Sequence, residues 1–263
     1  MTRNKQPLIT IVTVSFNAIS TIEQTISSVI NQTYPNIEYI IIDGGSTDGT
    51  VDIIKKYTDK ISYWVSEPDK GIYDAMNKGI HLAKGKWINF MNSGDTFYDN
   101  MVIEKVIDKA NLDSDIIYGN TNILLSHGEY IIKPQTISSK NYMPFGHQAV
   151  FSNTKLMKKY AFDINFKICA DKKFFYTAYK NNAKFEYIDI NISNYEAEDG
   201  VSANNMPQIV YEIGLIEGKT ENILWKFYYA SFIFLHNIKY IIKKTLPTSF
   251  LQHMRKIKYS HKL

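Results

Sequence analysis

The sequence has little of the chemistry that marks disulfide-bonded, secreted or membrane-spanning proteins. Its 263 residues include one cysteine, Cys169, which excludes an intramolecular disulfide and a cysteine-rich zinc site. No stretch of about 20 residues is both apolar and free of charge, and the first seven residues contain no apolar core. A conventional membrane span and a cleaved secretory signal are therefore not expected, and we expect the protein in the cytoplasm.

Motifs that would indicate several other chemistries are also missing. The first predicted strand is not followed by G-x-G-x-x-G, and the chain has neither a Walker A motif nor a G-x-S-x-G turn. Nicotinamide chemistry, P-loop phosphoryl transfer and α/β-hydrolase chemistry are thereby disfavoured. A nucleotidyltransferase is an alternative, but it needs a loop with Gly and Lys or Arg at residues 15–20, where none of these occurs.

Positive charge is concentrated in the C-terminal part of the chain. Residues 221–263 contain eight basic residues and one acid, whereas residues 1–220 contain 22 basic and 25 acidic residues, a net charge of −3. Residues 1–220 therefore lack the excess of basic residues typical of nucleic-acid-binding proteins, and no nucleic-acid partner is expected.

Apolar runs and helical patterns alternate through the first half of the sequence. Strands are predicted at residues 8–14, 37–42, 61–65 and 87–91, with helices near 19–30, 51–57 and 73–83. This alternation is typical of βαβ units and a parallel sheet. We expect an α/β domain over residues 1–205, with a mostly parallel sheet flanked by helices. A basic, aromatic helical region follows over residues 206–263.

Polar clusters follow three of the predicted strands. They are Ser15–Asn17, Asp43–Thr50 and Asn92–Asp95. Because the carboxyl ends of parallel strands meet at one edge of a sheet, these clusters are expected to lie together. Taken alone, residues 43–50 are also explained as a helix cap. Carboxylates beside one aromatic residue suit a nucleoside diphosphate held through a divalent cation.

Four segments resemble the ordered motifs of family 2 glycosyltransferases with the GT-A fold, namely Thr13–Asn17, Asp43–Thr50, Asp69–Gly79 and Phe90–Asp95. The resemblance covers roughly residues 7–203 and is nearest to bacterial enzymes that build capsule, O-antigen or exopolysaccharide. It implies inverting transfer of a hexose or N-acetylhexosamine from a UDP-sugar to a glycan acceptor, which we expect to be lipid-linked. It also implies Mn²⁺ or Mg²⁺ as cofactor. A non-catalytic relative that only binds sugar nucleotides is the alternative, because two of the motifs contain fewer acidic residues than those of the family.

The resemblance assigns the nucleobase to the ends of the first two strands. Val14, Phe16 and Asn17 would surround it, with Phe16 stacked on uracil and Asp43 accepting the ring N3–H. Many relatives carry a second acid after the first, and here Gly44 stands in its place. The alternative for Phe16 is an ordinary core aromatic.

The resemblance assigns the diphosphate and donor sugar to two further segments. Asp95, the one carboxylate of Asn92–Asp95, would hold the cation, with Ser93 beside it; a helix cap is the alternative for Asp95. The remaining candidates lie in the Asp69–Gly79 segment. They are Lys70, Asp74, Asn77 and Lys78. For the two candidate lysines, the alternative is a solvated surface side chain.

The acceptor side is expected in the second half of the domain. The resemblance makes Asp171 the general base that deprotonates the acceptor hydroxyl, with a helix N-cap as the alternative. His147 would donate to a phosphate or a sugar hydroxyl, or be a structural histidine. Residues 199–202 resemble a loop that closes over the substrates, hinged at Gly200.

The C-terminal region carries an apolar stripe at helical spacing. Its members are Ile223, Phe227, Ala230, Phe234, Ile238 and Ile241, with aromatic and lysine neighbours. Two explanations compete. The stripe packs on the domain or on a second copy of the chain, or it lies on the anionic inner face of the membrane. The sequence slightly favours peripheral membrane association.

Overall fold

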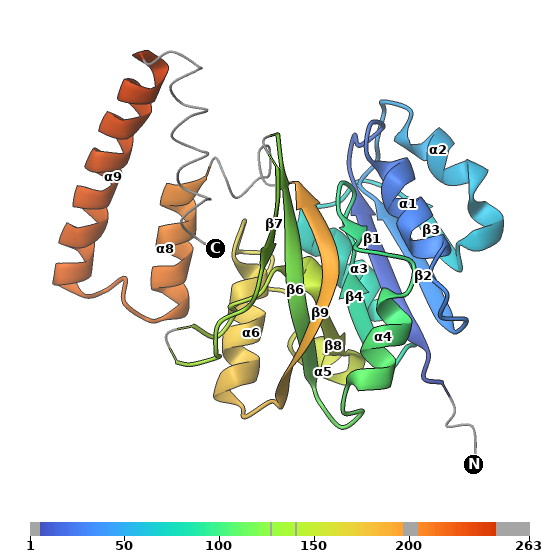
Figure 1. Ribbon diagram of the computed structural model, residues 1–263. Coiled ribbons are helices and arrows are strands. Elements are labelled where there is room, and N and C mark those ends of the chain that lie inside the picture. The colour runs from blue at the N-terminus through green and yellow to red at the C-terminus, as the bar shows by residue number, and fades with distance from the viewer. Residues whose placement is uncertain (1–5, 127, 140, 197–204, 246–263) are drawn as a thin grey trace.

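A mixed β-sheet with helices on both faces forms the body of the protein (Figure 1). The computed structural model describes residues 6–126, 128–139, 141–196 and 205–245. Within them the strand order is β3-β2-β1-β4-β8-β6-β9-β5, with β7 paired to β6. The strands are β1 (Ile9–Ser15), β2 (Ile37–Asp43), β3 (Tyr63–Ser66), β4 (Trp87–Phe90), β5 (Thr96–Phe97), β6 (Ile116–Leu125), β7 (Gly128–Ile132), β8 (Val150–Asn153) and β9 (Phe185–Glu196).

The first four strands are parallel, as the alternating pattern predicts. β1 pairs with β2 and β4, and β2 pairs with β3. All seven residues of β1 are buried, which explains why this strand is apolar on both faces. In the β1–β2 register Ser15 lies opposite Asp43, and the Ser93 N–H donates to the Val14 carbonyl at 3.1 Å. The three polar clusters therefore meet at one edge of the sheet.

The second half of the sheet mixes both strand directions. β8 runs antiparallel to β4 and β6, while β9 runs parallel to β6. β6 is one strand whose register against β9 shifts between Tyr118 and Thr121, and the strand continues past this irregularity. The pattern analysis predicts neither β5, which has only two residues, nor the helix α4 (Val102–Lys109).

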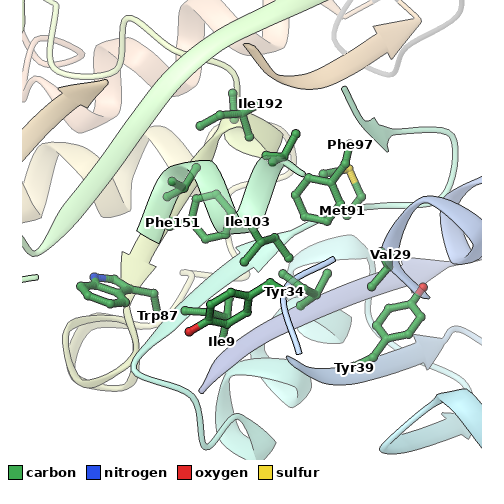
Figure 2. Packing of buried hydrophobic residues seen from close by; sticks show 14 of the residues in the cluster. Ile9, Val29, Tyr34, Tyr39, Trp87, Met91, Phe97, Ile103, Phe151 and Ile192 are labelled. Carbon is green, nitrogen blue, oxygen red and sulfur yellow. The ribbon is translucent and has the colours of Figure 1, made fainter. Parts of the chain in front are cut away.

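Two apolar cores lie between the sheet and its helices. One face carries α1 (Ile22–Ile30), α2 (Thr50–Lys56) and α4; the other carries α3 (Ile72–Leu82), α5 (Thr154–Tyr160) and α6 (Ala170–Lys180). Figure 2 shows part of the first core, with Trp87, Phe151 and Ile9 among the labelled side chains. Alternate residues of β1 enter opposite cores, so this strand fixes both layers against each other.

The helix α8 (Met206–Ile216) is joined to the domain through a buried acid. Glu212 is 1% exposed and accepts backbone N–H groups of Lys167, Ile168 and Cys169 at 2.8, 3.0 and 2.8 Å. Burial alone would raise the pKa of Glu212, but the Gln208 amide and these three N–H groups hold it below its usual range. Glu212 thus satisfies three backbone N–H groups of the segment that leads into α6, up to its N-cap Cys169.

The last described helix, α9 (Ile223–Thr245), lies on the outer side of α8, away from the sheet (Figure 1). Trp225 stacks on Tyr229 and contacts Tyr211 of α8, and a Cβ at Gly214 would overlap the Trp225 ring. The side of α9 that carries Trp225 and Tyr229 is therefore covered by α8. The division of the chain at residue 205 stays a prediction, although Glu212 ties α8 to the domain.

We expect Glu212→Gln to lower the free energy of unfolding by about 1–3 kcal/mol, because an amide at this position cannot accept all three N–H groups. Urea unfolding at neutral pH measures this change. Glu221→Gln is the matched control, since the Glu221 side chain is 94% exposed, and it should stay within about 0.5 kcal/mol of wild type. Equal stability of Glu212→Gln and wild type would contradict the role of Glu212.

Candidate active site

A cavity of about 410 Å³ opens beside the loop that follows β4, a size suited to a small-molecule site. Its walls are mostly apolar and come from α3, β4, β8, α5 and α6. The polar side chains that line it come from segments far apart in the sequence. They are Thr21, Tyr73, Ser93, Asp95, His147, Ser152, Lys167, Asp171, Tyr195 and Glu196. Four of the predicted site residues, Ser93, Asp95, His147 and Asp171, are thus brought together.

Asp95 places a carboxylate in this cavity without a hydrogen-bond donor among the described residues. It is 7% exposed, and its nearest charged or titratable partner is His147, whose Nε2 lies 3.8 Å from Oδ2. Burial, with the charge of Glu196 nearby, raises the pKa of Asp95 to about 8. Because α4 begins only at Val102, Asp95 does not cap a helix.

His147 lies next to Asp95 in the short 3₁₀ turn His147–Ala149. The Asn92 amide nitrogen is 3.0 Å from His147 Nε2. Since an amide NH₂ only donates, Nε2 is the acceptor in this contact and the ring proton sits on Nδ1. Burial lowers the pKa of His147, opposed by the charge of Asp171. The imidazole is therefore neutral at physiological pH, with its Nε2 lone pair engaged by Asn92 and its Nδ1–H as the donor.

Asp171 lines the same cavity from the first turn of α6. The N-cap of this helix is Cys169, so the capping alternative for Asp171 is wrong. Its Oδ1 accepts the Lys172 N–H at 2.7 Å and lies 3.3 Å from the Tyr73 hydroxyl, which donates to the Ile168 carbonyl at 2.5 Å. Burial, together with the charge of Asp171, raises the pKa of Tyr73 and keeps the phenol protonated.

Asp43 is the residue whose predicted role fits the structure least. It is fully buried, and its two oxygens accept five hydrogen bonds, from the hydroxyls of Ser15, Ser46 and Ser66 and the N–H groups of Gly45 and Ser46. Burial alone would raise the pKa of Asp43, but these donors hold it below its usual range. A carboxylate has about four lone-pair positions, so none is left for a base N–H.

The loop after β1 presents an aromatic ring to solvent. Phe16 is 64% exposed, which makes the core-aromatic alternative wrong. Asn17 has a positive φ of 47°, and its Oδ1 accepts the Thr47 N–H at 3.0 Å. The side chain of Asn17 therefore holds the loop rather than facing a ligand. Val14 is buried and contributes its carbonyl to Ser93.

The four candidates near α3 do not reach the cavity. Asp74, Asn77 and Lys78 line a separate hollow of about 390 Å³. Asn77 exchanges two 2.8 Å hydrogen bonds with the backbone of Phe162, and Lys78 pairs with Glu67 at 2.7 Å. Lys70 is exposed, and its backbone N–H donates to Asp74. The predicted diphosphate contacts of these side chains are not supported, because Asn77 and Lys78 are already bonded within the fold.

Two acidic residues of the site region carry no recognisable sequence signal. Glu196 lines the cavity at the end of β9, four residues beyond residue 192, where the apolar pattern of this strand ends. Glu212 supports the loop before Asp171. The predicted closing loop at residues 199–202 lies outside the described residues. Among those residues, no group of three or more His, Cys, Asp or Glu side chains is arranged to hold a metal ion.

Structural comparison finds solved chains of similar fold. S. aureus TarS 1–349, solved alone and with UDP, superposes with TM-scores of 0.64 and 0.63 at 19% identity, over 82% of this chain and 66% of that chain. A Pyrobaculum calidifontis mannosyltransferase in complex with GDP-Man and Mn²⁺ gives a TM-score of 0.63 at 12% identity, over 82% of this chain and 64% of that one. The chain thus spans slightly less than two thirds of the length of these structures. The predicted GT-A fold is confirmed.

Sequence comparison identifies the family. An uncharacterised glycosyltransferase of Mycobacterium tuberculosis is 32% identical over 176 residues, which is 64% of this chain and 67% of the relative. A PGL/p-HBAD biosynthesis glycosyltransferase of Mycobacterium bovis is 25% identical over 206 residues, 74% of this chain and 79% of the relative. The family model for glycosyl transferase family 2 matches residues 10–179, well over half of the chain. This protein therefore belongs to glycosyl transferase family 2.

Proposed function

We propose that this protein is an inverting glycosyltransferase that moves a hexose or N-acetylhexosamine from a UDP-sugar to a glycan acceptor. The observation that carries the proposal is that Asp95 and Asp171 line one cavity at the carboxyl edge of the sheet. Structures of similar fold bind UDP, UDP-GlcNAc and GDP-Man, which supports a nucleotide-sugar donor. Synthesis of a bacterial surface polysaccharide is the setting we propose.

The residues around Asp95 fit a divalent cation. The carboxylate is buried and has no donor of its own, and the buried Oδ1 of the neighbouring Asn92 has no partner among the described residues. Oxygen ligands of this kind suit Mn²⁺ or Mg²⁺, a hard cation that keeps further coordination positions for phosphate and water. When bound, the cation stabilises charge on the departing diphosphate. Asp95 would hold it, with His147 and Ser93 beside the diphosphate.

Asp171 would act on the acceptor. A general base must reach the hydroxyl that attacks the anomeric carbon, and its carboxylate must have an oxygen free to take the proton. Asp171 meets this requirement, because its contacts involve Oδ1 alone among the described residues. The backbone N–H of Lys172 fixes the orientation of the carboxylate, while the protonated Tyr73 holds the preceding carbonyl of Ile168. Glu212 supports the same turn from behind.

The acceptor is proposed to be lipid-linked and reached at an anionic membrane surface. No helix in the part of the chain that the structure describes is long and apolar enough to cross a membrane. Large apolar side chains on one face of α9 are nevertheless 38–74% exposed. They are Ile223, Leu224, Phe227, Tyr228, Phe234, Leu235 and Ile238. Residues 221–263 also carry eight basic residues against one acid.

This exposed face weighs against the explanation in which the stripe packs on the domain. α8 covers only the Trp225 and Tyr229 side of α9, leaving Phe227 and Phe234 uncovered by described residues. A helix with an apolar face and abundant lysine binds the interface of anionic bilayers. We therefore propose the bilayer rather than a second copy of the chain as the occupant of this face.

Replacing Asp95 by Asn should stabilise the metal-free protein at pH 8 while removing its response to Mn²⁺. The folded carboxyl keeps its proton up to about pH 8, whereas the unfolded one loses it near pH 4. Wild-type stability should therefore fall as pH rises from 5 to 8. A neutral amide at this position carries no such cost, so the variant should be more stable at pH 8 by at least about 1 kcal/mol.

Thermal unfolding at pH 5 and pH 8, with and without UDP and Mn²⁺, measures both effects of Asp95→Asn. Asp52→Asn serves as the control, because the Asp52 side chain is 78% exposed. A variant that still gains stability from Mn²⁺ with UDP as wild type does would contradict the metal role of Asp95.

Asp171→Asn should reduce the rate of sugar transfer by roughly 10²-fold or more, because an amide cannot take the hydroxyl proton. Binding of UDP should stay unchanged. UDP release in the presence of donor and acceptor measures turnover, and calorimetry measures binding. Asp59→Asn is the control, with a side chain that is 72% exposed. If UDP binding falls as much as turnover does, the assignment of Asp171 as base is wrong.

Phe227→Ser combined with Phe234→Ser should weaken binding to vesicles of phosphatidylcholine and phosphatidylglycerol by about tenfold or more, because two apolar rings no longer enter the bilayer. Cosedimentation measures this affinity. Ile131→Ser, which alters an exposed apolar residue of β7, should leave it unchanged. Unaltered binding by the double variant would contradict the proposal. A wild-type dimer that avoids vesicles and is lost in the double variant would assign the face to a second copy.

A further inference from the structure

A small patch at the carboxyl edge of the sheet combines an exposed aromatic ring with a carboxylate. Phe16 follows β1, Gly44 follows β2, and Asp69 lies in the loop between β3 and α3. A Cβ built on Gly44 would stand 2.6 Å from Asp69 Oδ2 and 3.3 Å from Phe16 Cδ2. The carboxylate of Asp69 and the ring of Phe16 therefore approach the same point, and glycine at position 44 leaves room for both.

The two oxygens of Asp69 have different surroundings. Oδ1 accepts the Gly71 N–H at 2.7 Å, which fixes the side chain at the start of α3. Oδ2 has no hydrogen-bond partner among the described residues, and the side chain is only half-buried. An acceptor of fixed position, with its second oxygen free, thus lies beside an aromatic ring that is 64% exposed.

Asp43 does not supply such an acceptor. Five donors already occupy its oxygens, and it has no exposed surface. Its hydrogen bonds to Ser46 and Gly45 instead shape the turn on which Gly44 stands. Ser46 also accepts the Asn17 N–H at 2.8 Å, so Asp43 indirectly sets the loop that presents Phe16.

We propose that Asp69, rather than Asp43, recognises the nucleobase of the donor. Phe16 stacks on the base, and Asp69 Oδ2 accepts its ring N–H. This inference rests on the proposed function, because it assumes a nucleotide-sugar donor. The patch and the cavity lie at the same edge of the sheet, since Phe16 follows β1 and the Val14 carbonyl of β1 accepts the N–H of Ser93, which lines the cavity.

The chemistry of a carboxylate restricts which bases fit. Ionised Asp accepts hydrogen bonds and cannot donate them. Uracil N3 and guanine N1 carry a hydrogen and match it, whereas cytosine N3 and adenine N1 carry a lone pair and oppose it. Asp69 therefore selects UDP or GDP over CDP and ADP, and Phe16 contributes stacking that is largely independent of the base.

Asp69→Asn tests the inference, because Asn keeps an oxygen that can accept the Gly71 N–H. Titration calorimetry with UDP, GDP, CDP and ADP in the presence of Mn²⁺ gives the affinities. We expect the preferred diphosphate, UDP or GDP, to bind roughly 10- to 100-fold more weakly to the variant, because one charge-assisted hydrogen bond is lost. Binding of CDP should not weaken, so the ratio of the two affinities falls.

Two further variants separate recognition from loop structure. Gly44→Ala places a methyl group at the point 2.6 Å from Asp69 Oδ2. It should also lower the ratio of the UDP or GDP affinity to the CDP affinity. Asp59→Asn, an exposed acid before β3, should not change it. Equal weakening of UDP and CDP by Asp69→Asn, or no weakening of either, would overturn the inference. Wild-type protein that binds none of the four diphosphates would instead overturn the proposed function.

Discussion

The site depends on one unfavourable burial, a carboxylate held in a cavity without a donor. Asp95 gains no hydrogen bond from the described residues to offset the loss of water, and its raised pKa of about 8 expresses that cost. The surrounding fold must therefore keep it there. The carbonyl of Asp95 accepts the Thr25 hydroxyl at 2.8 Å, and the Gly94 N–H donates to the same hydroxyl at 3.0 Å, so α1 fixes the loop. A cation would remove the cost that the buried carboxylate imposes.

The two functional carboxylates are positioned by different halves of the fold. Asp95 follows a strand of the parallel half and is held against α1, whereas Asp171 lies on α6, whose first turn is held by Glu212 of α8. α8 also supports α9 through Trp225 and Tyr211. The exposed face of α9 is therefore connected, through two helix contacts, to the turn that carries the proposed base. This arrangement links the proposed membrane-docking surface to the acceptor side of the site.

The sequence predicts features that depend on neighbouring residues better than features that depend on residues far apart in the chain. The apolar run of β1 and the polar clusters at three strand ends predict the parallel sheet and its functional edge, because both depend on residues close in sequence. The roles of Asp43 and Asn77 depend on partners far along the chain, Ser66 for the first and Phe162 for the second. No local pattern reveals these distant partners, although the Gly45 and Ser46 donors to Asp43 lie within three residues of it. Glu212 gives no signal for the same reason, since its three backbone partners lie more than 40 residues away.

The central claim is that Asp95 carries the cation that meets the donor diphosphate. Crystals grown with UDP and Mn²⁺ test it directly, because anomalous scattering locates the manganese independently of the protein atoms. The account predicts one manganese peak bonded both to an Asp95 oxygen and to diphosphate oxygens. A manganese ion on the diphosphate with the Asp95 carboxylate outside its coordination sphere would contradict it.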